Sequence, residues 1–417
     1  MPTLDWIGKK AVVNHHREVP YRLLKAEPGL SVGDPGAGNL LVQGDNLQAL
    51  KALLPYYAGQ VKCIYIDPPY NTGNENWVYN DAVNAPEIKK WLGQTVGKEA
   101  EDLSRHDKWL CMMYPRLQLL HQMLREDGAI FISIDDNEHA MLVAMLYEIF
   151  GSQNHICSFV WQKKHTVAND ARYVSDNHDF VVFFVKRRDS FKINKLPRTS
   201  IADARYTNPD NDTRSPWASG PCHAKTPNEK DIYEVTTPSG RKIWPPNGTS
   251  WRFSQSKFAA LVADNQIWFG KKGDTVPRIK RFLTQVSDGM VSPTILTRDH
   301  VGDNQEGNQE ASELLGKGRF ASPKPTRLIE RFLHLATDRS SLILDSFAGS
   351  GTTGHAVMKL NAADGGNRRF ILVEMEENIA RNITAERLKR VIPTFTSMPT
   401  GPGQETSKGA APAPGFQ

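Results

Sequence analysis

Asp67, Pro68, Pro69 and Tyr70 combine a carboxylate, a rigid backbone and an aromatic ring directly after the apolar run at 61–66. The carboxylate and a proline-fixed carbonyl can accept both N–H groups of a planar amine, and the ring offers a surface on which a base stacks. A plain strand-terminating turn would also explain the prolines, since proline ends a hydrogen-bonded ladder. The chemical interpretation predicts a catalytic corner for the amino group of a nucleobase.

A glycine turn lies near the other end of the chain. Gly349, Gly351 and Gly354 have G-x-G-x-x-G spacing, and Glu374 follows twenty residues after the last of them. Such glycines let a backbone approach an adenosine-bearing cofactor, and an acid after the next strand accepts hydrogen bonds from ribose hydroxyls. Taken alone, the turn equally fits a nicotinamide-dependent dehydrogenase. It is not a Walker loop, because no Gly-Lys-Ser/Thr follows.

Alternating apolar runs and helical periodicities must position these motifs, and they predict an α/β fold. Between them, the stretch 190–318 is rich in Asn, Asp, Pro, Gly and Thr, which predicts an inserted irregular domain. The residues after Pro393 have the composition of a disordered tail. Strands are predicted at 39–43, 61–66, 129–134, 158–161, 180–185, 341–344 and 370–373, and helices around 47–54 and at 107–124, 138–150, 326–336, 351–360 and 377–391. A turn at Gly128 is predicted to separate the helix 107–124 from the strand 129–134.

Composition narrows the class of protein. The 417 residues are 39% hydrophobic, with a net charge of +5, and no apolar run approaches the roughly 20 residues of a membrane span. With no signal-peptide pattern at the N-terminus, we expect a cytoplasmic protein. The four cysteines lack metal-ligand spacing, so we expect buried thiols and no metal site. Two basic groups are candidate DNA phosphate contacts: Lys186, Arg187, Arg188, and Lys271, Lys272, Arg278, Lys280, Arg281.

Both motifs resemble those of amino-group DNA methyltransferases that use S-adenosyl-L-methionine. An Asp-first corner resembles adenine-N6 enzymes more than cytosine-N4 enzymes, which usually carry Ser first. The resemblance includes the segments 44–46, 67–73, 133–136, 322–325 and 345–353. Shorter segments at 5–9, 177–179, 237–242 and 304–306 resemble the modification subunits of type III restriction–modification systems, although solitary methyltransferases resemble the same subunits.

The order of the motifs, corner first and glycine turn last, resembles the β group. It implies a circularly permuted, Rossmann-like S-adenosylmethionine-dependent methyltransferase sheet with an inserted irregular target-recognition region. The implied organisation is an N-terminal extension (1–38), a catalytic half (39–189), the target-recognition insertion (190–318), a cofactor-binding half (319–392) and the disordered tail (393–417).

The resemblance also implies roles for individual residues. Phe347, Gly349 and Gly351 would wrap the methionine portion of the cofactor, with Asp345 near its amino group. Glu374 would hold the ribose hydroxyls and Asp45 would accept from the adenine amine, although a helix cap would also explain Asp45 or Asp345, and Glu374 could simply begin a helix. The resemblance places Phe320 and Lys324 at the methionine end.

The function predicted from these residues is sequence-specific transfer of a methyl group to adenine N6 by direct displacement, on a base flipped out of double-stranded DNA. Trp77 and Tyr79 would assist on the loop after the corner. The alternatives are a cytosine-N4 or RNA amino-methyltransferase, a dehydrogenase, and a non-catalytic DNA-specificity subunit. Similar enzymes often work as dimers, so the partners considered are DNA, a second copy of the chain and a restriction-nuclease subunit, with no membrane.

Overall fold

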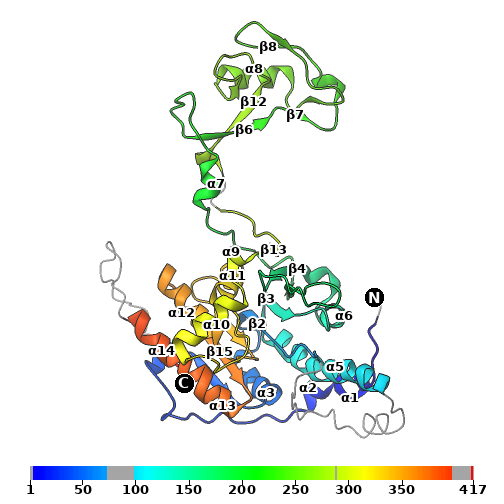
Figure 1. The fold of residues 1–417 in the computed structure, drawn as a ribbon, viewed down its shortest axis with the longest axis vertical. Coiled ribbons are helices and arrows are strands. Elements are labelled where there is room, and N and C mark those ends of the chain that lie inside the picture. Colours follow the sequence, from blue (N-terminus) through cyan, green and yellow to red (C-terminus); the bar gives the residue numbers. More distant parts are fainter. Residues whose placement is uncertain (1–2, 73–97, 287–288, 397–414, 417) are drawn as a thin grey trace. The chain divides into compact units, whose positions relative to one another are not determined.

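The computed structural model describes residues 3–72, 98–286, 289–396 and 415–416. These divide into two compact units (Figure 1). Unit 1 comprises 1–194 and 293–417, and unit 2 comprises 195–292. Each unit is considered by itself. Trp77 and Tyr79, the aromatic residues predicted to assist the catalytic corner, lie outside the described residues.

Unit 1 is built on an eight-stranded mixed sheet of order β1-β15-β14-β2-β3-β5-β4-β13. The first five strands in this order are mutually parallel, whereas β5 runs antiparallel to both β3 and β4. Its strands are β1 (Leu40–Gln43), β2 (Val61–Ile66), β3 (Leu124–Ile134), β4 (His155–Gln162), β5 (His178–Val185), β13 (Ile295–Leu296), β14 (Leu342–Asp345) and β15 (Arg369–Glu374).

Helices cover both faces of this sheet. Ile64 of β2 and Ile132 of β3 face a core shared with α3, α5 and α6. On the opposite face, Phe332 of α11 stacks on Tyr65 and Phe131. The helices of unit 1 are α1 (Lys9–Val12), α2 (His15–Glu18), α3 (Asn46–Tyr57), α5 (Lys98–Met123), α6 (His139–Phe150), α9 (Arg298–Val301), α10 (Asn304–Leu315), α11 (Thr326–Ala336), α12 (Thr352–Asp364), α13 (Glu377–Ile379) and α14 (Ala385–Thr396), with a π-helical turn at Ala380–Thr384.

The strand order brings the two ends of the chain together. The late strand β14 lies between β15 and the early strand β2, and β1 pairs with β15 at the sheet edge. Because the carboxyl ends of parallel strands meet at the same edge of a sheet, the residues at those ends converge. These residues are Asp45, Asp67, Asp345 and Glu374, and the edge that carries them is called the carboxyl edge below.

The predicted elements of unit 1 all occur, with shifts at some bounds. The bounds predicted for β2 and α11 match the structure. In contrast, β3 begins at Leu124, where the sequence had predicted the end of a helix and a turn at Gly128. Residues 397–414 of the predicted disordered tail lie outside the described residues. Phe416 forms an antiparallel bridge with Val32, and this end of the tail therefore packs on unit 1.

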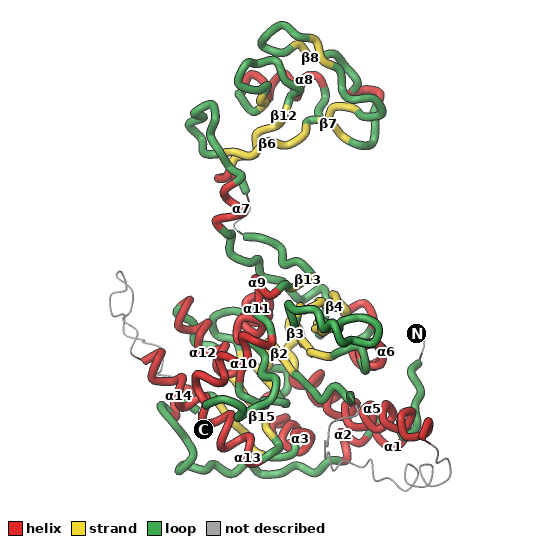
Figure 2. The backbone as a smooth tube through the Cα atoms, viewed as in Figure 1, coloured by secondary structure: helices red, strands yellow, loops and turns green. Residues whose placement is uncertain are grey.

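Unit 2 is smaller than the predicted insertion 190–318. Residues 293–318 form β13, α9 and α10 within unit 1, because β13 extends the large sheet beside β4. Unit 2 has short antiparallel pairings joined by long loops, as Figure 2 shows. Its core contains Trp251 and Phe258. Its elements are α7 (Ser200–Ala204), β6 (Trp217–Pro221), β7 (His223–Ala224), β8 (Val235–Thr236), β9 (Lys242–Ile243), β10 (Ser250–Trp251), α8 (Gln255–Ala263), β11 (Ile267–Trp268) and β12 (Arg278–Phe282).

Among the described residues, no helix has the length and apolar character needed to span a membrane.

Candidate active site

The glycine turn connects β14 to α12 at the carboxyl edge. Gly349 and Gly351 have φ angles of 49° and 76°, in the left-handed region that favours glycine. A Cβ atom built on Gly349 would lie 3.1 Å from Phe320 Cζ, so the phenyl ring closes on the turn. The Gly349 N–H donates to Glu374 Oε2 at 2.8 Å. The structure thus brings together four of the residues predicted to bind a cofactor.

Two carboxylates accompany this turn, of which Asp345 is buried and Glu374 is half-buried. Asp345 accepts hydrogen bonds from Thr353 Oγ1 at 2.5 Å and from the Phe347 N–H at 3.0 Å. Burial raises the pKa of Asp345 to about 7, and it also raises the pKa of Glu374. Neither carboxylate forms an ion pair with another described residue, so a bound cation or hydroxyl would relieve the cost of their burial.

Asp45 has a different environment. Its Oδ1 accepts from the Gln48 N–H at 3.0 Å and thereby caps α3, and its Oδ2 lies 3.2 Å from Arg116 NH2. The neighbouring Asn46 donates to the Ser346 carbonyl at 3.1 Å, which ties the end of β1 to the end of β14. Both oxygens of Asp45 are therefore engaged, as the helix-cap interpretation predicts.

The predicted catalytic corner follows β2 at the same edge. Trp109 of α5 is fully buried, and its indole N–H donates to the Pro69 carbonyl at 2.7 Å. Asn71, in the left-handed region with φ 60°, donates through Nδ2 to Glu138 Oε1 at 2.5 Å. His106 Nδ1 lies 2.6 Å from the same oxygen. Trp109 and His106 of α5, and Glu138 before α6, thus hold the corner in place through hydrogen bonds.

At the corner itself, Asp67 and Tyr70 each have one polar atom that makes no hydrogen bond within the described residues. Asp67 Oδ1 and the Tyr70 hydroxyl are buried without a hydrogen-bond partner among the described residues. Lys324 Nζ donates to the other oxygen of Asp67, Oδ2, at 2.6 Å. The structure thus places Lys324 against the catalytic corner rather than only beside the predicted cofactor residues.

The corner and the glycine turn face one space. Asp67, Lys324, Phe320, Asp345 and Gly349 line a single cleft of about 90 Å³, which is smaller than the range of about 300–1,000 Å³ typical of small-molecule sites. A group bound on the glycine turn and a group bound at Asp67 would be neighbours, which is the arrangement that group transfer needs.

The sequence did not predict several residues that support this cleft. Arg387, fully buried on α14, donates to Ser350 Oγ at 3.0 Å and to Thr352 Oγ1 at 2.9 Å, and so holds the glycine turn from below. Trp109 and Glu138 support the corner in the same way. Of these supporting residues, only Asn71 could have been found from the sequence, because it directly follows Tyr70 in the segment 67–73 that carries the family resemblance. Arg387 and Trp109 lie on helices and Glu138 directly precedes one, where a buried polar residue looks like an ordinary member of the periodic pattern.

The first predicted phosphate-binding group does not lie near the cleft. Lys186 follows β5, and its N–H donates to the Gly128 carbonyl near the start of β3. Since β5 runs antiparallel to β3, Lys186, Arg187 and Arg188 lie at the sheet edge opposite Asp67, about 20 Å away for six strand residues. Lys186 lies 3.3 Å from Glu126. This position argues against a contact with DNA that is bound at the cleft.

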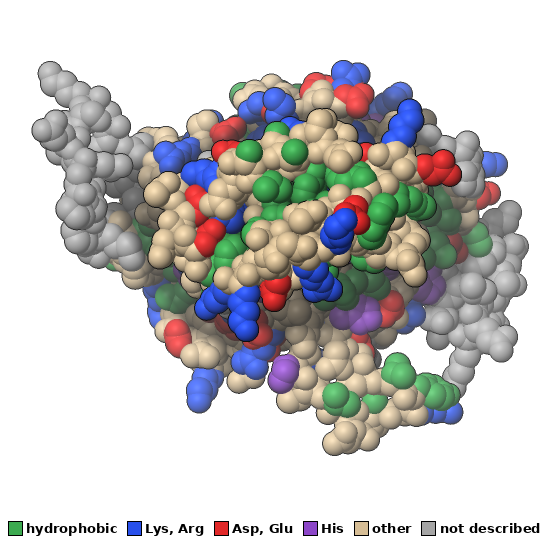
Figure 3. Space-filling view, turned by 90° about the horizontal axis from the view of Figure 1, so that it is seen from above, with side chains coloured by type: hydrophobic (Ala, Val, Ile, Leu, Met, Phe, Trp, Pro, Cys, Tyr) green, Lys and Arg blue, Asp and Glu red, His purple; other side chains and the backbone are tan. Residues whose placement is uncertain are grey.

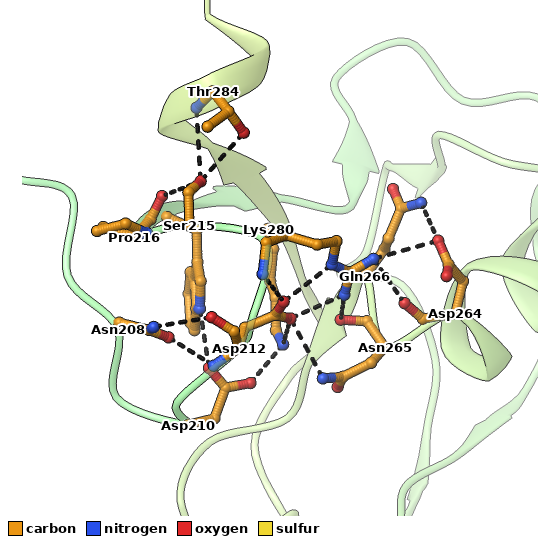
Figure 4. A network of polar contacts seen from close by, with 12 residues as sticks. Asn208, Asp210, Asp212, Ser215, Pro216, Asp264, Asn265, Gln266, Lys280 and Thr284 are labelled. Atoms are coloured by element: carbon orange, nitrogen blue, oxygen red, sulfur yellow. Dashed lines mark hydrogen bonds and ion pairs between the residues drawn. The ribbon is translucent and has the colours of Figure 1, made fainter.

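The second predicted phosphate-binding group lies in unit 2 and contains both exposed and buried residues. Lys271, Lys272, Arg278 and Arg281 are exposed. Lys280 is buried, contacts Asp210, and lies 3.1 Å from Asp212 Oδ2 (Figure 4). Arg214 binds the same carboxylate at 2.7 Å and holds the pKa of Asp212 far below its usual range. The prediction that Lys280 contacts phosphate is therefore corrected: it is an internal ion-pair residue.

One face of the molecule carries both apolar and basic side chains. Figure 3 shows hydrophobic side chains gathered on the face nearest the viewer, with Lys and Arg side chains around them. Trp244, with 55% of its surface exposed, and Val276, with 42%, are among the exposed apolar residues of unit 2. A surface of this kind combines apolar contact area with positive charges.

Comparison with known proteins gives a family match over most of the chain. The model of a family described as DNA methylase matches residues 61–386. The Mod subunit of the type III restriction-modification enzyme StyLTI from Salmonella typhimurium is 34% identical over 92% of this chain and 60% of its own length. The EcoP15I Mod subunit from Escherichia coli is 28% identical over 90% of this chain and 64% of its own length.

The chain thus spans less than two thirds of these two relatives. The type II methyltransferase M.KpnI from Klebsiella pneumoniae is 27% identical over 81% of both proteins. Among solved structures, the cytosine-N4-specific PvuII DNA methyltransferase aligns over 86% of this chain and 92% of its own, with 14% identity and a TM-score of 0.43. The M1.HpyAVI complex with S-adenosylmethionine aligns over 84% and 98%, with 14% identity and a TM-score of 0.40.

Proposed function

The chain belongs to the DNA methylase family, and from this premise we propose that it transfers the methyl group of S-adenosylmethionine to adenine N6 in double-stranded DNA. The observation that carries the proposal is the shared cleft, in which Asp67 and the glycine turn line one space. A dehydrogenase would use the turn but has no role for the corner. A non-catalytic specificity subunit would have no need of an intact corner joined to that turn.

The residues of the cleft suit this cofactor. We assign Asp345, which lines the cleft, to the ammonium group of the cofactor, and Glu374, which accepts from the Gly349 N–H beside it, to the ribose hydroxyls. The left-handed glycines leave the backbone open to close approach. When bound there, S-adenosylmethionine would supply an electrophilic methyl group, whose bond to the sulfonium breaks to release a neutral thioether.

The residues of the corner hold the acceptor. Asp67 Oδ1, which has no partner among the described residues, accepts one amino N–H, the Pro68 carbonyl accepts the other, and Tyr70 stacks on the flipped base. No side chain acts as a nucleophile. The corner aligns the nitrogen and excludes water, and Asp67 holds the proton that becomes acidic after transfer. Such alignment is worth up to about 7–11 kcal/mol in favourable cases.

The finer description of the fold follows from the same proposal. We interpret the large sheet as a circularly permuted Rossmann-like methyltransferase sheet, because β14 and its glycine turn come last in the chain and yet lie beside β2. Unit 2 is the target-recognition region, and its exposed Lys271, Lys272, Arg278 and Arg281 contact phosphates. The protein acts in the cytoplasm, on its own or with a second copy or a restriction subunit.

Incubation with unmethylated plasmid DNA and methyl-labelled S-adenosylmethionine, followed by digestion to nucleosides, tests this function. We expect the label in N6-methyladenine. Label in N4-methylcytosine, or label only when RNA is supplied, would contradict the proposal. Saturable nicotinamide binding without S-adenosylmethionine binding would favour the dehydrogenase.

A further inference from the structure

Lys324 lies at the meeting point of the catalytic corner and the glycine turn. We propose that it is the positioning residue of the catalytic carboxylate, holding Asp67 Oδ2 so that Oδ1 faces the target amine; this proposal rests on the function above. Its ammonium donates to Asp67 Oδ2 at 2.6 Å. It also lies 5.1 Å from the centroid of the Tyr70 ring and 5.8 Å from that of Trp161. One cation thereby contacts both reactive side chains of the corner.

The backbone around Lys324 is fixed from several sides. Pro325 restricts the backbone angles of Lys324, the residue before it, and Pro323 on the other side has a fixed φ of its own. Gly307 of α10 packs directly on this segment: a Cβ atom there would lie 2.1 Å from the Pro323 carbonyl oxygen. Thr352, at the start of α12, donates through Oγ1 to the Lys324 carbonyl at 3.2 Å. The lysine is therefore tied to the same residues that follow the glycine turn.

The side chain of Lys324 is confined as well. It is 9% exposed, against 26% for Asp67. Asp179, buried on β5, is close enough for the Lys324 charge to act on its carboxyl, although burial raises the pKa of Asp179 overall. Lys163 binds Asp179 Oδ1 at 2.7 Å. Asp179 thus has Lys163 as its ion-pair partner, whereas Lys324 pairs with Asp67.

The division of the two oxygens of Asp67 explains how the pair can serve the reaction. A lysine bound to both oxygens would compete with the substrate amine. Here Oδ2 is occupied, while Oδ1 is buried without a partner among the described residues. The ion pair sets the rotation of the carboxylate and leaves one directed acceptor. This role differs from the methionine-end contact that the family resemblance implied for Lys324.

The two roles predict different kinetics. A lysine that binds the cofactor would change the affinity for S-adenosylmethionine, whereas a lysine that orients Asp67 changes the turnover of the bound complex. Lys324→Met keeps the length of the side chain and removes its charge, and Lys324→Arg keeps the charge. Lys62→Met is the matched control. Lys62 is also buried and lies on β2, the strand that leads to the corner, but it pairs with Asp127 at 2.9 Å at the opposite end of that strand.

The experiment measures S-adenosylmethionine Kd by calorimetry, single-turnover methylation of plasmid DNA at saturating cofactor, and the thermal midpoint of each variant. We expect Lys324→Met to slow methylation by about 10²-fold with Kd changed by less than about threefold. Lys324→Arg should recover part of that rate, and Lys62→Met should methylate at the wild-type rate.

Two results would overturn the proposal. One is a loss of cofactor affinity as large as the loss of rate, which would place Lys324 on the cofactor; the other is a wild-type rate in Lys324→Met. If Lys324→Met does not fold, Lys324→Arg decides by the same comparison of rate with Kd. Wild-type protein that methylates no adenine would instead contradict the proposed function, so the two failures are distinguishable.

Discussion

The cleft at the carboxyl edge and the polar network of unit 2 both bury lysine–carboxylate pairs, and they differ in what those pairs leave unsatisfied. In unit 2, Lys280 contacts both Asp210 and Asp212, and Arg214 binds Asp212 as well (Figure 4). In the cleft, Lys324 satisfies only one oxygen of Asp67, and the other has no partner among the described residues. A saturated network holds a loop-rich fold together, whereas an unsaturated pair is ready to receive a ligand.

The largest expected effect concerns the unsaturated pair. In Asp67→Ala the amine loses its directed acceptor, so we expect turnover to fall by about 10³-fold or more, as when a preorganised polar group is removed from an active site. Binding of S-adenosylmethionine should persist, since the glycine turn is untouched. Rapid-quench methylation and calorimetry measure the two quantities. Near-normal turnover in Asp67→Ala would contradict the view that the cleft pair serves the reaction while the network of unit 2 serves stability.

The saturated pair should respond in stability instead. Lys280→Met removes the ammonium partner of the half-buried Asp210 and leaves the buried Asp212 with Arg214 alone. Breaking a buried ion pair costs about 3–5 kcal/mol, and the retained Arg214 should keep the loss at or below that range. Urea unfolding followed by the fluorescence of Trp217, which contacts the same network through Asp210, measures the change in stability. Unchanged stability, together with weakened DNA binding, would show that Lys280 acts at the DNA surface after all.

A smaller effect is expected on the salt dependence of DNA binding, and it distinguishes exposed cations from buried ones. Lys271 and Lys272 are exposed, so replacing both with Ala should leave the unfolding midpoint unchanged. The slope of log K against log salt for DNA binding should become shallower by about 1.8, because each phosphate that the protein neutralises adds about 0.9 to its magnitude. The matched control is Lys186→Ala with Arg187→Ala at the opposite sheet edge, which should keep the wild-type slope. A flatter slope in the control variant alone would show that Lys186 and Arg187, and not Lys271 and Lys272, contact phosphates.

The last prediction concerns Asp345 and depends on pH. Burial raises its folded-state pKa to about 7, above its unfolded value of about 3.9. The folded protein therefore binds the extra proton between these values, and this contribution to stability is lost as pH rises from about 4 to about 7. A bound ammonium favours the charged carboxylate, so cofactor affinity should strengthen over the upper part of that window. Asp345→Asn should flatten both profiles. Calorimetry at several pH values checks this, and an unchanged profile in the variant would exclude Asp345.

The sequence predicted much of the large sheet and the residues that meet at its carboxyl edge. The six residues of β2 are all buried, and such continuous apolar runs are typical of a central parallel strand. The amphipathic pattern of α11 set its bounds equally well. The convergence of Asp67, Asp345 and Glu374 followed from the strand ends together with the permuted parallel sheet that the family resemblance implied, because parallel topology fixes where those ends lie.

What the sequence could not predict depends on contacts between distant residues. Lys324 and Asp67 are separated by 257 positions, and no local pattern marks them as partners. The burial of Lys280 depends on Asp210 and Asp212, which reach it from another loop of unit 2. The segment 293–318 looked like loop because its strand is only two residues long, and its membership of unit 1 follows from pairing with β4.

The most direct test of the central claim is the identity of the methylated base made in cells. Mass spectrometry of genomic nucleosides, from a host without adenine methylases of its own, would compare cells that express the wild-type protein with cells that express Asp67→Ala. If the Asp67 corner transfers the methyl group to adenine, N6-methyladenine should be present with the wild type and absent with the variant. N6-methyladenine in both, or N4-methylcytosine in place of it, would contradict that claim.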